Sequence, residues 1–241
     1  MEASEQDEYL HWQQGGQGGS QTEVMPAGLA QESANSRNVK PNMPRGRYQA
    51  NFTKASLLIP ESRIVAGLLL KELDEDQWHQ AIVVDNVLQK RTKNTAMTQA
   101  SLIRNRLITM GPELWSLVSE GGKLIATHAV LAATIKFSPL LGDFMDLVIR
   151  DQFRRFEKNL RPPLWDEYLE GCHQRDPDMP AWSESTRAKL KQNAFRMMAE
   201  AGYLHDTRSM RLQRVQISPE VIDYLKEHKE SYVMKCLQVS R

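Results

Sequence analysis

The stretch that most constrains the fold runs from Trp182 to Ile217, because it joins a helical period, a glycine stop and two short extended runs. Ser183 is a favoured N-cap residue, and Glu184 places negative charge at the first helical turn. Apolar residues then recur at helical spacing and form one stripe, at Leu190, Ala194, Met197 and Ala201. The pattern predicts a helix over residues 183–201.

The residues that follow this helix predict a wing. Gly202 lies where a left-handed C-terminal cap is expected. Tyr203 and Leu204 form one short extended run, Arg211 to Ile217 form another, and polar residues 205–209 separate them. A helix, a glycine stop and a two-stranded ribbon are typical of a winged-helix arrangement.

The polar face of the same helix suggests a DNA-binding role. At 100° per residue, the face opposite the apolar stripe carries Ser185, Lys189, Gln192 and Arg196. These residue types donate hydrogen bonds to base edges and phosphates. The ribbon adds Arg208, Arg211 and Arg214. We therefore expect the helix to enter the major groove and the ribbon to lie on the backbone; the alternative is a solvated basic helix packed on a hairpin.

A second basic spot, at Lys90, Arg91 and Lys93, precedes a helix predicted to start at Asn94 or Thr95. Its apolar stripe consists of Ala96, Ala100, Ile103, Leu107 and Met110. On the other side lie Thr98, Ser101 and Asn105, with Arg104 and Arg106 on the flanks. This arrangement is similar to a helix-turn-helix, so the DNA-binding candidates here are Lys90, Arg91, Lys93 and Asn105. Any surface helix would look much the same, which is the alternative.

Composition defines the general class of the protein. The 241 residues carry a formal net charge of +1 and are 41% hydrophobic, which suffices for one or two domains with a sizeable core. Because the chain is nearly neutral, its total charge predicts no partner. The prediction of a nucleic-acid partner therefore depends on the local basic clusters. Two cysteines, Cys172 and Cys236, are too few for a disulfide framework and favour a cytoplasmic setting. No apolar run approaches the roughly 18 residues of a membrane span.

The chain divides into three regions. Residues 1–47 are rich in Gly, Ser, Gln and Asn without a periodic apolar face, which predicts a disordered N-terminal extension. Residues 48–160 are predicted to form an N-terminal helical domain, and Arg161-Pro162-Pro163 marks its boundary with a C-terminal winged-helix-like domain, residues 161–241. The predicted fold class is mainly α, with two helical domains, helix-turn-helix and winged-helix-like features, and one small β-ribbon.

Several further positions have specific predicted roles. Residues 123–137 are apolar around much of the circumference of a helix, which predicts a central buried helix. Within it, His128 is expected to be a hydrogen-bonded core or edge histidine. Asp143 is predicted to cap the helix that follows it. A short helix over residues 164–169 is expected to end at Gly171, which leaves Cys172 and His173 in a loop.

Enzymatic motifs are missing from the sequence. We find no phosphate loop, no dinucleotide glycine fingerprint, no zinc-ligand array and no nucleophile elbow. The adjacent Cys172 and His173, near Asp176, do not make a triad, and the acidic cluster at residues 72–76 has no matching histidine or cysteine spacing for a metal. We therefore expect no catalytic residue, no metal, no cofactor and no small-molecule substrate.

Six short stretches, taken together, carry a resemblance to a known family. They read YQANFTKASLL (residues 48–58), DNVLQKR (85–91), QASLIRNRL (99–107), MGPELW (110–115), LLGDF (140–144) and AEAGYL (199–204). In these stretches the chain resembles the BrxA family of BREX phage-defence systems, over about residues 48–241.

The resemblance implies a bacterial cytoplasmic protein with a likeness to the NusB antitermination fold. It also implies binding of double-stranded DNA without a known enzymatic step, alongside other BREX proteins. Two alternatives stay open at this point. One is an adaptor that holds other proteins of the defence complex, and the other is an RNA-binding protein like NusB.

Overall fold

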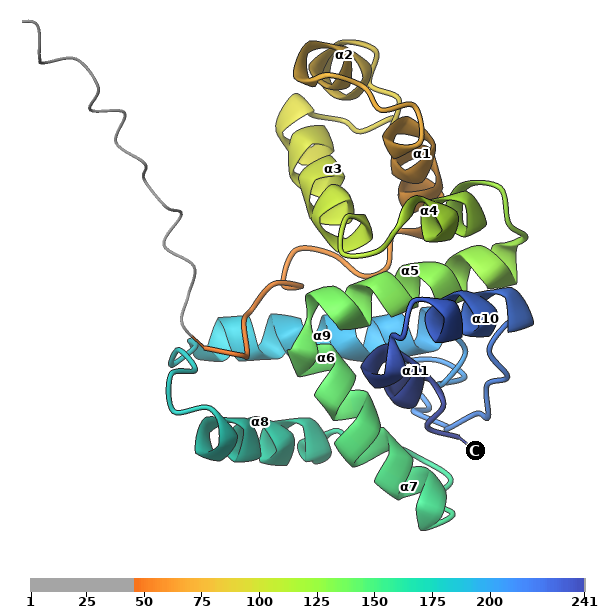
Figure 1. Cartoon of the computed structure of the whole chain (residues 1–241). Helices are drawn as coiled ribbons and strands as arrows, with labels where there is room; N and C mark the ends of the chain where they lie inside the picture. Colours follow the sequence, from red (N-terminus) through yellow and green to blue (C-terminus); the bar gives the residue numbers. More distant parts are fainter. Residues whose placement is uncertain (1–45, 241) are drawn as a thin grey trace, which may run out of the picture. The chain divides into compact units, whose positions relative to one another are not determined.

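A computed structural model describes residues 46–240, and this part of the chain is mainly α-helical, as predicted (Figure 1). Its isolated extended pairings are two antiparallel bridges, between Asn159 and Arg211 and between Leu204 and Leu212. The predicted disordered extension, residues 1–47, lies outside the described residues except for its last two positions.

The first group of helices consists of α1 (Ile59–Leu69), α2 (Glu75–His79), the π-helical turn η1 (Gln80–Val84), α3 (Lys93–Leu107) and α4 (Pro112–Ser119). Pro60 occupies the first turn of α1, where its missing N–H is tolerated. Asp74 closes a capping box with Gln77 at the start of α2. Because α1 packs against both α3 and α4, these helices form one layer, seen above α5 in Figure 1.

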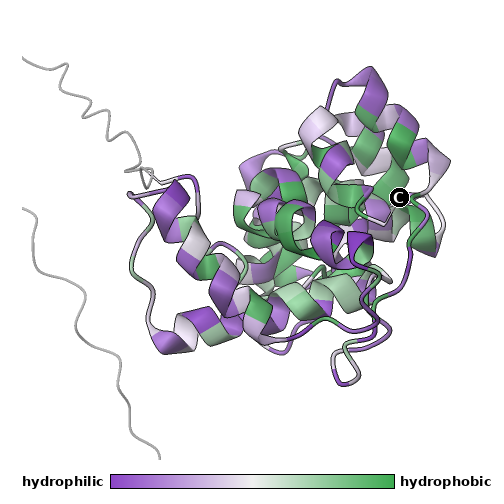
Figure 2. Cartoon of the chain, turned by 90° about the horizontal axis from the view of Figure 1, so that it is seen from below, coloured by the Kyte–Doolittle hydropathy of each residue, from purple (hydrophilic) through white to green (hydrophobic). Residues whose placement is uncertain are grey.

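The helix α5 (Lys123–Phe137) is the centre of the packing. It contacts α1, α3, α4, α6, α10 and α11, and residues 126–135 are all buried. A helix with neighbours on every side is apolar around its whole circumference. Figure 2 shows the hydrophobic residues gathered in the central helices, while hydrophilic residues dominate the outer turns. The prediction of a central buried helix is confirmed.

His128 of α5 is fully buried and hydrogen-bonded to Ser218. The Ser218 main-chain N–H donates to His128 Nδ1 at 3.1 Å, and the Ser218 hydroxyl lies 2.9 Å from the same nitrogen. Burial lowers the pKa of His128 below its ordinary value of 6.5, so the ring is neutral at pH 7. The prediction of a hydrogen-bonded core histidine is confirmed.

One long helical rod follows, made of α6 (Pro139–Asp143), η2 (Phe144–Ile149) and α7 (Arg150–Arg154). The prediction that Asp143 caps a helix is wrong. Pro139 starts the rod four residues earlier, and Asp143 has helical backbone angles inside it. The Asp143 carboxylate is therefore available to distant side chains, as described below.

The helix α8 (Pro163–Arg175) is one turn longer than predicted. It does not end at Gly171, and Cys172 and His173 lie on the helix rather than in a loop. The Cys172 side chain is fully buried in the core, which holds this last turn. A Cβ atom at position 171 would lie 3.1 Å from Arg175 Nη1, so the glycine leaves room for that guanidinium.

The helix α9 (Glu184–Glu200) agrees with the prediction for residues 183–201. The Ser183 hydroxyl accepts a hydrogen bond from the Thr186 N–H at 3.3 Å, and Gly202 has a φ of 85°. All four residues of the predicted stripe are buried: Leu190, Ala194, Met197 and Ala201.

The predicted two-stranded ribbon over residues 203–217 is not confirmed. The main chain of residues 210–213 is shared between two neighbours. On one side, His205 N donates to Arg211 O and Gln213 N donates to Tyr203 O, each at 2.9 Å. On the other side, Leu160 N donates to Met210 O and Leu212 N donates to Lys158 O, also at 2.9 Å. Because the pairing is divided between residues 203–205 and 158–160, each pairing stays short.

The last helices, α10 (Pro219–Glu227) and α11 (Ser231–Leu237), pack on α5. Buried residues from Tyr48 to Val239 form one hydrophobic cluster. Trp165 of α8 contacts Phe144 at a ring-centroid distance of 4.8 Å, and both Phe52 and Phe195 at 6.4 Å. Residues before and after position 160 both contribute to this core. The domain boundary between residues 160 and 161 stays a prediction.

Within residues 46–240, none of the helices has by itself the length and apolar character to cross a membrane. The pair formed by α5 and the α6–α7 rod reaches both criteria jointly, but the two parts are bent by 107°.

Candidate nucleic-acid interface

The described surface contains a groove that is lined by one predicted DNA-binding residue from each helix, Asn105 of α3 and Lys189 of α9. A hollow of about 480 Å³ lies between α3 and residues 50–54 and is lined by Asn105. An adjoining hollow of about 430 Å³ shares Thr53, Lys54, Asn94, Thr98 and Leu102 with the first, and it reaches Lys189 of α9. We call the two hollows together the α3–α9 groove. Its wall consists mainly of amides, hydroxyls and two lysines.

The helix α3 presents its polar face to this groove, and that face lies opposite the apolar stripe, as predicted. Thr92 is the N-cap, because its hydroxyl accepts from the Thr95 N–H at 3.2 Å. The helix therefore begins slightly earlier than the predicted cap at Asn94 or Thr95. The apolar stripe is buried at Ala96, Ala100, Ile103 and Leu107. The opposite face lines the groove with Thr98, Ser101 and Asn105.

The floor of the groove is formed by residues 50–54, the first part of an irregular segment that continues to residue 57 and is held by side chains from distant helices. Asn193 of α9 donates its amide N–H groups to Phe52 O at 2.8 Å and Thr53 O at 3.0 Å. Glu200, also on α9, accepts from the Ser56 hydroxyl at 2.8 Å and the Leu57 N–H at 2.9 Å. The sequence reasoning did not identify either residue, because its partners lie 140 or more positions away.

Arg106 of α3 does not lie on the outer flank, as the helical pattern suggested, but is only 1% exposed. Its Nη1 donates to Ser56 O at 2.7 Å, and its Nη2 to Ala55 O at 3.4 Å. Burial lowers the pKa of Arg106 to about 10, so the side chain keeps its charge at pH 7. The free carbonyl groups of the irregular segment explain why a guanidinium is buried here.

The basic spot before α3 is only partly free. Lys90 is 19% exposed, and its ammonium group pairs with the Glu61 carboxylate of α1. Arg91 and Lys93 are exposed, and no carboxylate in the described part of the chain lies within ion-pair distance of them. These two residues have side chains available for phosphate.

The predicted recognition face of α9 is exposed at all four positions: Ser185, Lys189, Gln192 and Arg196. Arg196 pairs with Glu200 at 3.2 Å but stays 65% exposed. The neighbouring basic residues of α9 face α8 instead, where Arg187 pairs with Glu170 at 2.9 Å and Lys191 with Asp166 at 2.7 Å. Lys189 has no such partner in the described residues, and it is the one that lines the groove.

The predicted wing residues Arg208, Arg211 and Arg214 are all exposed. Asp206 shapes the turn that contains Arg208 and leads to Arg211. Its carboxylate accepts hydrogen bonds from the N–H groups of Ser209 at 2.7 Å and Arg208 at 2.8 Å. These hydrogen bonds hold the pKa of Asp206 below its ordinary value. The wing is a basic turn rather than a regular ribbon.

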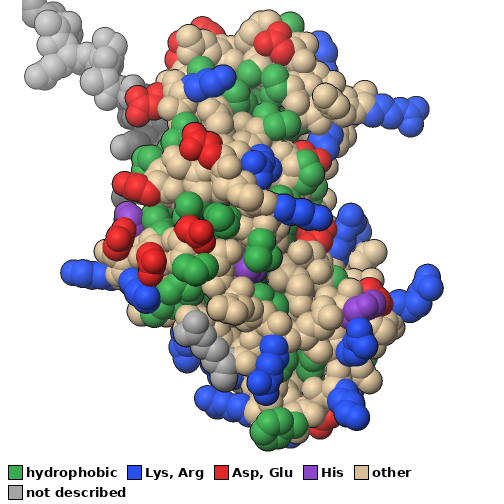
Figure 3. Space-filling model, turned by 90° about the vertical axis from the view of Figure 1, so that its right-hand side faces the viewer, with side chains coloured by type: hydrophobic (Ala, Val, Ile, Leu, Met, Phe, Trp, Pro, Cys, Tyr) green, Lys and Arg blue, Asp and Glu red, His purple; other side chains and the backbone are tan. Residues whose placement is uncertain are grey.

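The pairing with residues 158–160 adds basic side chains that the sequence reasoning did not assign to this surface. They are Arg154, Arg155, Lys158 and Arg161, all exposed. Figure 3 shows Lys and Arg side chains gathered on the lower part of this face. Only the long-range main-chain hydrogen bonds reveal that residues 154–161 and 208–211 are neighbours.

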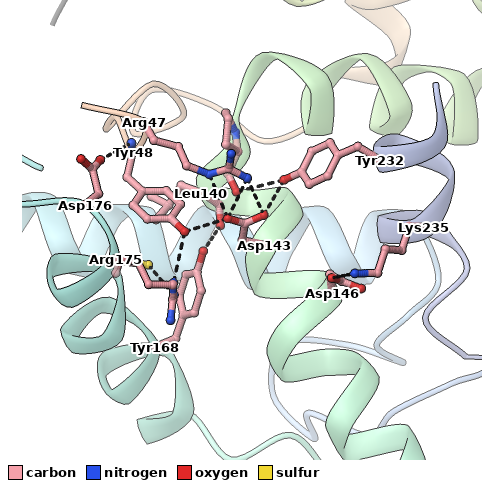
Figure 4. A network of polar contacts seen from close by, with 12 residues as sticks. Arg47, Tyr48, Leu140, Asp143, Asp146, Tyr168, Arg175, Asp176, Tyr232 and Lys235 are labelled. Atoms are coloured by element: carbon pink, nitrogen blue, oxygen red, sulfur yellow. Dashed lines mark hydrogen bonds and ion pairs between the residues drawn. The ribbon is translucent and has the colours of Figure 1, made fainter. Parts of the chain in front are cut away.

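Asp143 anchors the beginning of the groove segment (Figure 4). Its carboxylate accepts hydrogen bonds from Arg47 at 3.0 Å and from the hydroxyl groups of Tyr48 and Tyr232, each at 2.7 Å. The Tyr48 N–H also donates to the Asp176 carboxylate at 2.9 Å. The hydrogen bond to Asp143 raises the pKa of Arg47 above its ordinary value. This network fixes the segment that enters the groove floor.

No group of three or more metal-ligating side chains occurs in the residues that the structure describes. Cys172 is buried, and burial raises the pKa of its thiol, so the thiolate form is disfavoured. His173 and Cys172 both lie on α8; in the described residues the Cys172 sulfur accepts a hydrogen bond from Arg175 Nη2 at 3.3 Å, and no carboxylate pairs with His173.

The fold and the site define a helical protein with a polar, lysine-containing groove and a separate basic turn. The family profile of BrxA matches residues 46–229, and the chain belongs to the BrxA family. A curated relative from Paramagnetospirillum magneticum, named BREX protein BrxA, is 54% identical over 198 residues, which cover 82% of this chain and 100% of the relative. The resemblance read from the sequence is thereby confirmed.

More distant relatives agree. A protein named BREX protein BrxA from Escherichia coli is 33% identical over 77% of this chain and 87% of its own length. The chain is also similar to a solved structure, the crystal structure of an uncharacterized protein from Magnetospirillum magneticum. That likeness has a TM-score of 0.76 and 54% identity, and it covers 80% of this chain and 100% of the other.

Proposed function

We propose that this chain is a cytoplasmic, non-enzymatic component of a BREX bacteriophage-defence system that binds double-stranded DNA. The observation that carries the proposal is the α3–α9 groove, which brings the polar face of α3, with Asn105, and Lys189 of α9 to one surface. Membership of the BrxA family supports the part that concerns the defence system.

Phosphate contacts supply most of the affinity in this proposal. Lysine and arginine side chains without an internal carboxylate partner are the ones that can neutralise phosphates. In the described residues these include Arg91, Lys93 and Lys189, together with Arg208, Arg211 and Arg214 of the wing. Lys90 contributes less to phosphate binding in this proposal, because the Glu61 carboxylate already neutralises its ammonium group.

Base contacts fall to the uncharged polar side chains. Gln192 and Asn105 carry amides that match the paired donor and acceptor of adenine in the major groove, and Ser185 can contact several bases. Gln192 and Ser185 are exposed on α9, while Asn105 lines the groove from α3. A single hydrogen-bonded contact of this type discriminates one base pair by about 1–3 kcal/mol.

The test is a titration of fluorescent duplex DNA with purified full-length protein at several salt concentrations. The slope of log affinity against log salt is expected to be about −0.9 for each phosphate contact. The variant R208E/R211E/R214E should bind all sequences more weakly and with a flatter slope. Gln192→Ala should change the sequence preference at one position and leave the slope unchanged.

A matched control is Lys226→Glu, since Lys226 is exposed on α10 and pairs with Asp223. It changes the net charge in the same direction as a single wing reversal, outside both basic regions. The groove variant Lys189→Glu should weaken binding more than Lys226→Glu does. Equal weakening by the two variants would mean that attraction by the total charge, and not the groove, accounts for binding.

An adaptor function is the second candidate, favoured by the exposed Met97 that lines the groove beside its polar groups. A surface of mixed apolar and amide character also suits a polypeptide from another BREX protein. Binding to purified BREX proteins, without salt-dependent binding to duplex DNA, would favour the adaptor. Preference for duplex or single-stranded RNA in the same titration would favour the NusB-like alternative.

A further inference from the structure

Phe156 is the most exposed large hydrophobic side chain in the described part of the chain, at 82%. It follows α7, and its φ is 58°, in the left-handed region. The Phe156 N–H donates to Phe153 O at 3.1 Å, and the Glu157 N–H donates to Gln152 O at 3.0 Å. This pair of hydrogen bonds is a Schellman motif, in which the residue at the Phe156 position is usually glycine.

A phenylalanine at this position is unfavourable for the isolated fold. Its Cβ atom is crowded in the left-handed conformation, and its ring stays in water without contributing to the core. An exposed bulky residue with positive φ is an outlier whose explanation is sought in function. The ring is therefore placed for contact with something outside the chain.

Basic residues surround this ring in the sequence. Residues 154–161 contain four basic residues and one acidic residue, Glu157. Arg155 pairs with Asp151 at 2.9 Å but stays exposed. In the described residues no ion pair engages Arg154, Lys158 or Arg161. Three of the four basic residues beside Phe156 in the sequence are therefore not neutralised by an ion pair within the described part of the chain.

The wing brings further cations next to the same turn. Asn159 forms its antiparallel bridge with Arg211, while Leu160 and Met210, beside them, are buried. Phe156 is three residues from Asn159, so their Cα atoms are at most about 11 Å apart. Arg208 lies in the turn that leads to Arg211 and is exposed. We call residues 154–161 with 208–211 the Phe156 patch.

We propose that the Phe156 patch is a second contact surface for duplex DNA, in which the Phe156 ring inserts against a base step from the minor groove while the surrounding cations hold the flanking phosphates. This inference rests on the proposed DNA binding and specifies how one of its two basic regions works. Apolar side chains used in this way unstack one base step partially and bend the duplex.

The charge and shape of the patch favour DNA over other partners. Its basic residues precede and follow Phe156 in the sequence and continue in the paired segment at Arg208 and Arg211, a charge that complements the phosphates on the two sides of a narrow groove. Within the patch, Glu157 is the single carboxylate against six basic side chains, those of Arg154, Arg155, Lys158, Arg161, Arg208 and Arg211. Of the carboxylates beside the patch, Asp151 pairs with Arg155, and Asp206 accepts the turn N–H groups and contacts His205 at 2.6 Å. A flat membrane surface would be expected to engage several apolar residues, whereas one ring protrudes here.

The test uses a duplex of about 20 base pairs with a 2-aminopurine reporter for unstacking and a fluorophore pair on its ends for bending. Wild-type protein should raise the 2-aminopurine signal and shorten the end-to-end distance. Phe156→Ala should abolish both changes and weaken affinity about tenfold, with an unchanged salt slope because no phosphate contact is lost. Phe156→Trp should restore both signals.

Two control variants separate the ring from the charges around it. Leu124→Ala removes another exposed apolar side chain, 60% exposed at the start of α5, and should behave like wild type. R154E/R161E should flatten the salt slope, which Phe156→Ala does not. Circular dichroism on each variant verifies that the fold is retained, as expected for exposed positions.

Each outcome has a definite meaning. If wild-type protein binds duplex DNA in a salt-dependent way and Phe156→Ala matches it in all readouts, the inference is overturned and the proposed function stands. If wild-type protein does not bind DNA, both fail. Loss of binding to phosphatidylcholine–phosphatidylserine vesicles in Phe156→Ala, with DNA binding intact, would assign the ring to a membrane surface and also overturn the inference.

Discussion

The side-chain amide of Asn193, in the middle of α9, donates a hydrogen bond to the main-chain oxygen of Phe52 at 2.8 Å. The same amide reaches the next carbonyl along the chain, that of Thr53, at 3.0 Å. The helix expected to contact DNA is thus joined directly to the floor of the α3–α9 groove.

Asn193→Ala should lower the free energy of unfolding by about 1–3 kcal/mol, because two partly buried carbonyl groups lose their donor. Urea denaturation measures the change. The neighbouring Gln192→Ala is the control, since Gln192 is exposed and should alter stability by less than about 0.5 kcal/mol. Equal losses in the two variants would contradict the role of Asn193.

Leu190→Ala should cost about 2–5 kcal/mol, because Leu190 is fully buried in the stripe of α9 and the truncation leaves a cavity. Ser185→Ala, on the exposed face of the same helix, serves as the comparison. Chemical denaturation with an unchanged m-value is the measurement. A loss below about 1 kcal/mol would show that α9 does not depend on this packing.

Stability should fall as the solution is acidified through pH 6.5. Burial lowers the pKa of His128 in the folded protein, so below pH 6.5 the unfolded chain binds a proton that the folded chain resists. The contribution of His128 is complete above pH 6.5 and is lost as the pH falls below it. Melting temperatures at a series of pH values between 8 and 5, for wild type and His128→Gln, test this. The variant should show a shallower dependence, and equal slopes would count against it.

Phe156→Gly should raise the free energy of unfolding by about 1 kcal/mol, because glycine adopts the positive φ of this position without crowding. Phe156→Ala, which keeps the Cβ atom, should not give the same gain. Thermal denaturation of the two variants side by side distinguishes relief of backbone strain from removal of the ring. Stabilisation by both to the same extent would assign the effect to the ring.

Local periodicity accounts for the parts of the fold that could be predicted. The stripe of α9 and the apolar surround of α5 each depend on residues within one helix, so spacing alone revealed them. The end of α8 was misplaced because Gly171 looked like a stop, whereas burial of Cys172 continues the helix. Tertiary packing prevailed over local propensity there.

The candidate site was harder to predict, because pairings between distant residues decide which side chains are free. Lys90 looked as available as Arg91, yet Glu61 lies 29 positions away in the sequence and neutralises only Lys90. Helical spacing predicted that Arg106 lies on the flank of α3, but its guanidinium donates hydrogen bonds to the carbonyl groups of residues 55 and 56. The pairing of residues 158–160 with the wing leaves no periodic signal in either segment.

The Asp143 carboxylate has a consequence for the order in which the protein is completed during synthesis. Arg47 and Tyr48 are made before α1, but Tyr232, the third donor to Asp143, is made only after α10. A chain that stops before α11 already contains α3 and α9. In such a chain the Asp143 carboxylate, which holds the start of the groove segment, lacks the hydrogen bond from Tyr232. The set of hydrogen bonds at Asp143 is therefore complete only after α11 has been made and has packed.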